Sequence, residues 1–292
     1  MLTKRNACLV FDDGEIIRGY GFGATGLSVA ELCFNTSMSG YQEIISDPSY
    51  ADQIILFTFP HIGNVGVNPD DNESVKAYAS GIITHLKPTT PSNWRKTDRL
   101  NNWLIQKKII GLYGVDTRGL TLRLRDKGAI NVVICHQENC EFNYNKMIKL
   151  AKEWPGLNGL DLAKKVTCNE TYYWNQGLWS SPGKYNDTKI NKKVVAIDFG
   201  VKKNILRSLS NLGCEIKVVP ATTPFKQIIE YNPNGIFLSN GPGDPKETGK
   251  YIIPVLKEII EKTQLPIFGI CLGHQILALA LGGKTIKMKT GH

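Results

Sequence analysis

The sequence has few cysteines and no arrangement of them that is typical of a zinc site or a disulfide framework. Its seven cysteines are scattered, their number is odd, and none occurs as Cys-x-x-Cys. No apolar stretch approaches the roughly 20 residues needed to cross a bilayer, and residues 1–5 lead into a strand pattern without a secretory apolar core. We therefore expect reduced thiols, no membrane partner and a cytoplasmic location. Frequent Lys, Asn and Ile are typical of an AT-rich genome, which leaves an organelle such as a plastid open.

The sequence also lacks the charge pattern of a nucleic-acid-binding protein. Lys and Arg number 35 against 26 Asp and Glu, for a net charge of +9. The excess is spread in Lys-rich runs, and no Arg-rich patch alternates with aromatic residues. We expect a solvated basic surface or one that meets an acidic partner protein, and no nucleic-acid partner.

The length of 292 residues predicts about two domains. Residues 1–150 have a mixed α/β pattern, with a hairpin around Asp12-Asp13-Gly14. Further strands are predicted near 31–36 and 53–58, and helices near 100–104 and 117–125. Residues 151–192 are rich in turn signals and are interpreted as a linker region, with the linker itself at about 170–192.

Residues 193–292 have a different sequence pattern from the preceding residues, because short apolar runs alternate with segments of helical periodicity. This alternation predicts an α/β domain with a doubly wound parallel sheet, covered by helices on both faces. In such sheets ligands bind beyond the carboxyl ends of the strands, where two loops, 239–245 and 269–273, are expected.

The second of these loops has the form of a nucleophile elbow. Residues 269–275 read GICLGHQ, with Cys271 between two glycines that permit a tight turn from strand to helix. The helix N-terminus would face the sulfur and favour the thiolate, which is the nucleophilic form. The alternative is a small buried hydrophobic cysteine, but the flanking glycines favour a catalytic thiol.

The other loop, residues 239–245, reads SNGPGDP and follows an apolar strand. Gly-Pro-Gly can form a tight turn without any further role. Its unhindered backbone N–H groups could also stabilise an anion on the atom that Cys271 attacks, and the pairing of the two loops favours that function.

Three other patterns are interpreted as structural. Residues 21–26, GFGATG, fit a dinucleotide-binding motif, but their strand belongs to a hairpin and no helix pattern follows. Asp198-Phe199-Gly200 has no accompanying kinase motifs and is expected at an ordinary strand end. His274 lies close to Cys271, where we favour a structural role over that of a general base.

Several long motifs resemble the family of small, glutamine-hydrolysing subunits of carbamoyl-phosphate synthase. The elbow and the SNGPGDP loop resemble a class I glutamine amidotransferase domain, and the narrower resemblance covers essentially the whole chain. It is carried by residues 34–43 (FNTSMSGYQE), 47–50 (DPSY), 60–66 (PHIGNVG), 155–163 (PGLNGLDLA) and 198–207 (DFGVKKNILR).

The resemblance implies that Cys271 attacks the carboxamide of L-glutamine and forms a thioester. Backbone N–H groups near Gly243 and Leu272 would hold the oxyanion. The family positions that bind glutamine match Ser49, Gly241, Gly243, Leu272 and Gln275. Ammonia would pass to a large synthetase subunit, which uses ATP and Mg²⁺ to make carbamoyl phosphate for arginine biosynthesis, pyrimidine biosynthesis or both. No metal or cofactor site is expected in this chain.

The sequence departs from the family at its C-terminal end. The family completes its catalytic triad with a His and, two residues on, a Glu, whereas no His-x-Glu follows Cys271 here and His292 matches a different family position. We therefore expect an incomplete amidotransferase domain, either a fragment or the product of a decayed or split gene. The alternative function is a non-catalytic subunit that docks on the large subunit.

Overall fold

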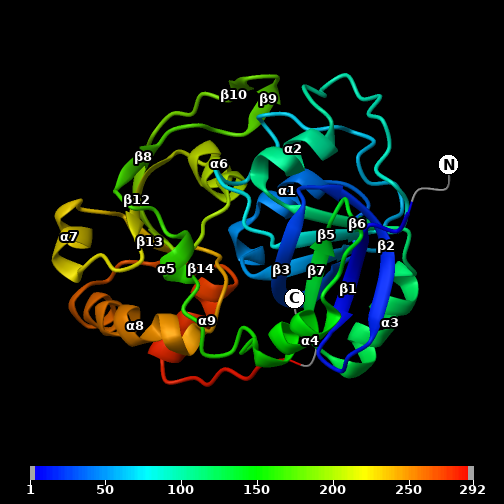
Figure 1. The fold of residues 1–292 in the computed structure, drawn as a ribbon. Helices are drawn as coiled ribbons and strands as arrows, with labels where there is room; N and C mark the ends of the chain where they lie inside the picture. Colours follow the sequence, from blue (N-terminus) through cyan, green and yellow to red (C-terminus); the bar gives the residue numbers. More distant parts are fainter. Residues whose placement is uncertain (1–3, 289–292) are drawn as a thin grey trace. The chain divides into compact units, whose positions relative to one another are not determined.

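The computed structural model describes residues 4–288 and divides them between two compact units (Figure 1). The first unit comprises residues up to Gly156 together with Lys287 and Met288, and the second runs from Leu157 to Ile286. Residues 1–3 and 289–292, and with them His292, lie outside the described residues. None of the described helices is long and apolar enough to span a bilayer.

The first unit is built on a closed barrel in the order β1-β2-β6-β5-β4-β3-β7 (Figure 1). The predicted hairpin is confirmed, because Ala7 pairs with Gly19 and Val10 with Ile16 on antiparallel strands. The strands of the unit are β1 (Ala7–Phe11), β2 (Ile16–Gly23), β3 (Gly26–Asn35), β4 (Gln53–Phe57), β5 (Gly81–Thr84), β6 (Ile110–Tyr113) and β7 (Ile130–His136). Its helices are α1 (Tyr41–Ser46), the 3-10 turn η1 (Pro48–Tyr50), α2 (Leu100–Lys107), α3 (Thr117–Lys127) and α4 (Tyr144–Glu153).

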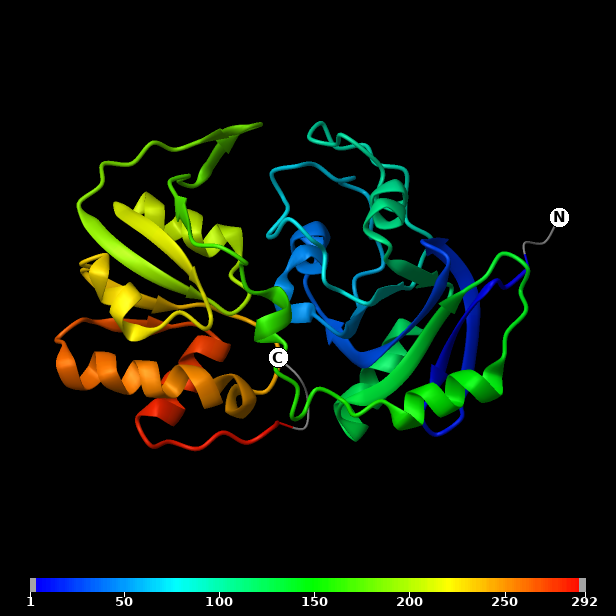
Figure 2. The same cartoon turned by 60° about the vertical axis from the view of Figure 1, so that its left-hand side comes forward.

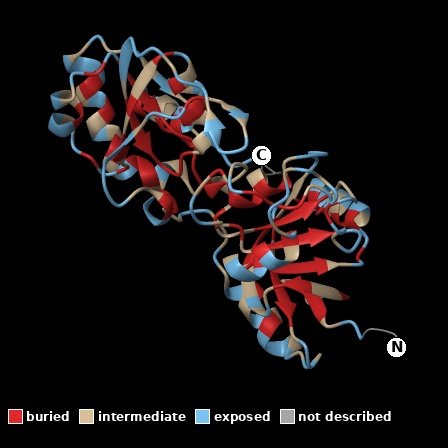
Figure 3. Ribbon diagram, turned by 90° about the horizontal axis from the view of Figure 1, so that it is seen from above, coloured by how far each residue is buried: buried red, intermediate tan, exposed pale blue. Residues whose placement is uncertain are grey.

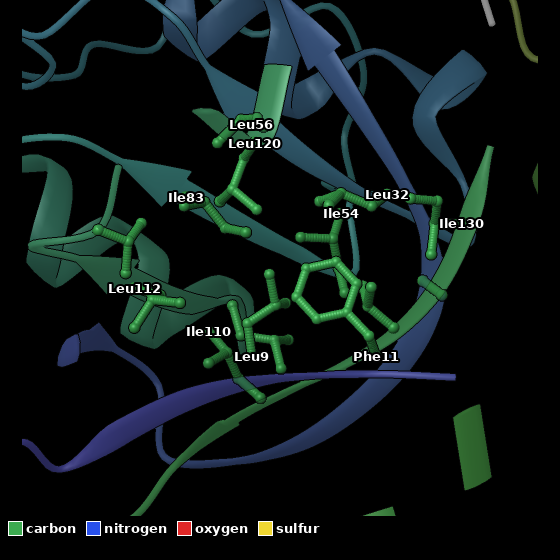
Figure 4. Packing of buried hydrophobic residues seen from close by; sticks show 14 of the residues in the cluster. Leu9, Phe11, Leu32, Ile54, Leu56, Ile83, Ile110, Leu112, Leu120 and Ile130 are labelled. Atoms are coloured by element: carbon green, nitrogen blue, oxygen red, sulfur yellow. The ribbon is translucent and has the colours of Figure 1, made fainter. Parts of the chain in front are cut away.

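Alternating apolar residues of these strands fill the barrel interior, which Figure 4 shows from close by. Leu9 and Phe11 of β1 meet Ile54 of β4 there, and Leu120 of α3 packs against the same cluster. Burying such side chains contributes about 1.5–3 kcal/mol each, so this core is a main source of the stability of the unit.

The second unit holds a sheet in the order β14-β13-β11-β12-β8, in which the first four strands are parallel and β8 is antiparallel. Its strands are β8 (Tyr172–Trp174), β9 (Trp179–Ser181), β10 (Lys184–Tyr185), β11 (Lys192–Asp198), β12 (Cys214–Pro220), β13 (Gly235–Leu238) and β14 (Ile267–Gly269). Its helices are α5 (Ala163–Val166), α6 (Lys203–Asn211), α7 (Phe225–Glu230), α8 (Pro245–Lys262) and α9 (Leu272–Ala280).

Helices cover both faces of this sheet, as the alternating α/β pattern predicts (Figure 2). Ile236 and Leu238 of β13 face a core formed with α7, α8 and α9. Phe237 of the same strand faces the opposite side, where α6 contributes Leu206. Within each unit the buried residues concentrate on the strands and the exposed ones on the outer faces of helices (Figure 3), so the doubly wound fold class is confirmed.

The segment predicted as a linker region, residues 151–192, is more structured than its turn-rich composition suggests. From Leu157 onward it belongs to the second unit. It contains α5 and the short hairpin β9–β10, and β8 adds an edge to the sheet by pairing Tyr172–Trp174 with β12. A three-residue edge strand is too short for the alternation of apolar and polar residues to distinguish it from a turn.

Candidate functional site

The residue at the centre of the elbow, Cys271, is exposed and stands between β14 and α9 with φ 51° and ψ −113°. A positive φ is strained for any residue with a Cβ, at a cost of about 1–3 kcal/mol, and such strain gathers at functional sites. The strand–turn–helix geometry of a nucleophile elbow is therefore present at the cysteine that the sequence singles out.

The two flanking glycines are required because the chain has no room for side chains there. A Cβ built on Gly269 would lie 2.7 Å from the backbone nitrogen of His274. A Cβ on Gly273 would lie only 2.2 Å from the carbonyl oxygen of Leu238, on the neighbouring strand β13. The Gly273 N–H donates to the carbonyl of Ser239 at 3.0 Å, so the first turn of α9 is bonded directly to the end of that strand.

The helix that follows gives the elbow its electrostatics. Leu272 is the first residue of α9, so its N–H lies at the helix N-terminus, where backbone donors have no partner within the helix. The partial positive charge of this end favours an anion, here a thiolate or a developing oxyanion. His274 and Gln275, on the same first turn, are exposed side chains.

The second predicted loop, residues 239–245, follows β13, which is adjacent to β14 in the sheet. Since neighbouring parallel strands end at the same edge, this loop and the elbow lie at one edge of the second unit. A Cβ on Gly241 would lie 2.1 Å from the carbonyl oxygen of Phe199, and Gly243 has φ +97°. Glycine is therefore demanded at both positions, by a close backbone approach and by left-handed geometry.

The first two residues of this loop fasten it to the end of β11. The buried hydroxyl of Ser239 accepts a hydrogen bond from the Phe199 N–H at 2.8 Å. The buried amide of Asn240 accepts from the Lys202 N–H at 3.1 Å and donates to the Gly200 carbonyl at 2.9 Å. These side chains are occupied in holding the backbone, so the chemistry of the loop rests on its main-chain N–H groups.

The Asp198-Phe199-Gly200 sequence has the structural role that we expected of it. One carboxylate oxygen of Asp198 accepts from the N–H groups of Gly200 and Val201, at 2.8 and 2.7 Å, and the other accepts from the Cys168 N–H at 2.7 Å. Burial raises the pKa of this carboxyl, against the lowering effect of its three backbone donors. Residues 21–26 likewise span the end of β2, a short connection and the start of β3, and no helix begins there.

Four of the glutamine-binding positions implied by the resemblance lie together in the second unit: Gly241 and Gly243 on one loop, and Leu272 and Gln275 at the start of α9. Ser49 lies in the first unit, on η1, where its N–H donates to the Asp47 carboxylate at 2.9 Å. Its assignment to the glutamine site stays a prediction. Among residues 4–288, no group of three His, Cys, Asp or Glu side chains is placed to hold a metal ion.

Sequence reasoning missed one group of residues at this site. The segment 159–162 lies against the SNGPGDP loop, and a Cβ on Gly243 would come within 2.8 Å of the carbonyl oxygen of Leu160. Asp161 accepts from the Thr248 and Tyr251 hydroxyls on α8, each at 3.3 Å. The PGLNGLDLA motif marked the segment as distinctive, but nothing local in it indicates a contact about 80 residues away.

A cysteine elbow beside a glycine-rich loop, on a doubly wound parallel sheet, is the arrangement typical of class I glutamine amidotransferase domains. The chain matches that class, described as "Glutamine amidotransferase class-I", over residues 195–292. Over residues 9–134 it matches "Carbamoyl-phosphate synthase small chain, CPSase domain".

Relatives extend this similarity over nearly the whole chain. The chain is 52% identical over 292 residues to the "Carbamoyl phosphate synthase small chain" of Ruegeria pomeroyi, covering 100% of this chain and 75% of the relative. Proteins of the same description from Bradyrhizobium diazoefficiens and Mesorhizobium japonicum are 51% and 50% identical, each with 99% of this chain and 74% of the relative covered. The chain therefore belongs to the carbamoyl-phosphate synthase small chain family.

Proposed function

We propose that this chain is the glutamine-hydrolysing subunit of a carbamoyl-phosphate synthase. The observation that carries the proposal is Cys271, exposed at a strained elbow as the N-cap residue of α9. A structural cysteine would not need the strained combination of φ 51° and ψ −113° between two glycines that are packed without room for a Cβ. The family membership supports glutamine as the substrate.

The Cys271 thiolate attacks the carboxamide carbon of glutamine and forms a carbon–sulfur bond. The electron pair of the carbonyl moves to oxygen, and the N–H groups of Leu272 and Gly243 are suited to stabilise that oxyanion. When the tetrahedral intermediate collapses, the carbon–nitrogen bond breaks and the nitrogen takes up a proton, leaving as ammonia. Water then attacks the thioester and the carbon–sulfur bond breaks, which releases glutamate, the thiolate and two protons, one of which replaces the proton taken up by ammonia.

The remaining assignments concern substrate binding and partners. Ser49, Gly241, Gly243, Leu272 and Gln275 would hold the glutamine, as the family resemblance implies. The partner would be a large synthetase subunit that receives the ammonia and uses ATP and Mg²⁺, in a pathway leading to arginine or pyrimidines. The scattered, reduced cysteines support a cytoplasmic location.

The test is glutamate production by the chain in complex with its large subunit, compared with a Cys271→Ser variant. We expect the variant to lose glutamine hydrolysis and glutamine-dependent carbamoyl phosphate synthesis, while synthesis from added ammonium salt continues. Cys140→Ser, at a half-buried cysteine of the first unit, is the matched control and should behave as wild type. Glutamate production that survives Cys271→Ser would refute the proposal.

A further inference from the structure

The segment Gly159–Leu162, which we name the strap, crosses the loop that carries Gly243. We propose that the strap is a positioning element for the oxyanion-binding N–H of Gly243, and that the carboxylates of Asp244 and Asp161 fasten it in place. The inference rests on the proposed function, because it assigns the strap a role in the same reaction. All of these residues belong to the second unit.

The strap and the loop exchange hydrogen bonds immediately beside Gly243. The Asp244 N–H donates to the Leu160 carbonyl at 3.0 Å, and the Gly159 N–H donates to one carboxylate oxygen of Asp244 at 3.1 Å. The other oxygen of that carboxylate accepts from the Lys246 N–H at 2.9 Å and caps the N-terminus of α8. One side chain thus joins the strap, the loop and the helix.

Gly243 is enclosed by the strap as well as bonded beside it. A Cβ at this position would lie 2.8 Å from both the Leu160 carbonyl oxygen and the Leu162 nitrogen. Leu162 itself is almost fully buried. The backbone of Gly243 therefore has no freedom to move toward the strap, and its φ of +97° sets the direction of its N–H.

A second fastening lies further along the strap. Asp161 accepts from the hydroxyls of Thr248 and Tyr251, on the first two turns of α8, and forms an ion pair with Lys164 at 3.4 Å. Thr248 is fully buried. Burial and the nearby Asp161 carboxylate both raise the pKa of Tyr251, which keeps its hydroxyl protonated as a donor.

These contacts matter for catalysis because an oxyanion donor works only when it is held in place before the reaction. Loss of one such donor lowers kcat by about 10²–10³-fold, and a displacement of about 1 Å costs on the order of 10²-fold. Asp244 and Asp161 act through Gly243 and do not themselves touch the substrate, so both are positioning residues.

The discriminating variant is Asp244→Asn. Asparagine is as good a helix N-cap as aspartate, so the bond from Lys246 is retained, but an amide that keeps this bond turns its NH₂ group toward the Gly159 N–H. The matched control is Asp116→Asn, which makes the same change at the N-cap of α3, where Asp116 accepts from Gly119 in the first unit. Asp161→Asn tests the second fastening independently.

In complex with the large subunit, we expect Asp244→Asn to lower the glutaminase kcat by about 10–100-fold, with KM changed by less than about threefold. Alkylation of Cys271 by iodoacetamide should stay at the wild-type rate, because the elbow is untouched. Amide hydrogen exchange should accelerate in the peptide covering residues 239–245 and stay unchanged in the peptide covering residues 267–275. Asp116→Asn should match wild type in every assay.

The proposal is overturned if Asp244→Asn and Asp161→Asn both keep wild-type kcat, or if kcat and the rate of Cys271 alkylation fall together, which would place the damage at the elbow and not at Gly243. A wild-type complex without glutaminase activity would refute the proposed function instead. In that case the exchange measurement still tests the strap, since unchanged protection of residues 239–245 in both variants would refute it.

Discussion

Replacing Gly273 with alanine tests whether the elbow depends on the close contact between α9 and β13. The new Cβ would lie 2.2 Å from the Leu238 carbonyl oxygen and 2.7 Å from the Leu238 Cβ. Real Cβ atoms essentially never approach other heavy atoms closer than 3.0 Å, so the helix start must retreat from the strand by about 0.8 Å. The obstacle is backbone, which no side-chain rotation relieves.

The retreat would move both Cys271 and the N–H of Leu272, since they occupy the turn immediately before Gly273. A shift near 1 Å costs on the order of 10²-fold in rate, so we expect glutaminase activity to fall by about 30–100-fold. Overpacking of this kind also costs about 1–3 kcal/mol of stability. The hydrogen bond from the Gly273 N–H to the Ser239 carbonyl would lengthen from its present 3.0 Å.

The matched control is Gly235→Ala, at the start of β13 in the same sheet. A Cβ there would have its nearest contact at 3.4 Å, to the Pro266 carbonyl oxygen, which is an ordinary packing distance. Glutaminase rates and urea unfolding of both variants should be compared in parallel. If Gly273→Ala keeps activity within about threefold of Gly235→Ala, the close packing of the elbow is not what positions the nucleophile.

Three further outcomes follow from burial and hydrogen bonding in the two units. Iodoacetamide under native conditions should alkylate the exposed Cys271 first and spare Cys168, since burial raises the pKa of that thiol to about 12; peptide mass mapping that finds Cys168 labelled as fast would contradict this. Asp198→Ala would leave three backbone N–H donors without their acceptor, so we expect the free energy of unfolding in urea to fall by about 3 kcal/mol or more. Burial raises the pKa of Glu43 to about 7 from 4.5, so its contribution to stability is complete below pH 4.5 and is lost as pH rises through 7. Wild type should therefore lose up to about 3 kcal/mol of unfolding free energy relative to Glu43→Gln as the pH rises from 4.5 to 8. An equal pH dependence of the unfolding free energy in the two proteins would refute the assignment.

The second unit was largely predictable because its signals are local. Parallel strands buried on both faces appear as short continuous apolar runs, and β11, β12 and β13 fall where those runs stand. The elbow is marked by seven consecutive residues, 269–275, so it can be recognised in the sequence without knowledge of the β13 residues that it packs against. The role of Cys271 in catalysis is a separate matter and stays a prediction.

The barrel of the first unit could not be deduced in the same way. Its closure depends on β7 pairing with both β1 and β3, which are separated from it by about a hundred residues. The parallel neighbours β4, β5 and β6 are short, and the segments between β4 and β6 contain long stretches without regular structure. Periodicity identifies such strands one at a time, but the order in which they pair is decided by tertiary packing.

The strap shows why a functional site is harder to predict than the fold that carries it. The two loops were found because each follows a strand, and adjacent parallel strands end at one edge of the sheet. Gly159 and Asp244 are 85 residues apart, and their hydrogen bond leaves no periodicity in either segment. What the sequence does contain is a pair of glycines and an aspartate in a turn-rich region, a pattern that also fits an ordinary linker. The hydrogen bonds to Asp244 and the 2.8 Å approach to Gly243 distinguish the strap from such a linker, and these contacts exist only once the whole unit has folded.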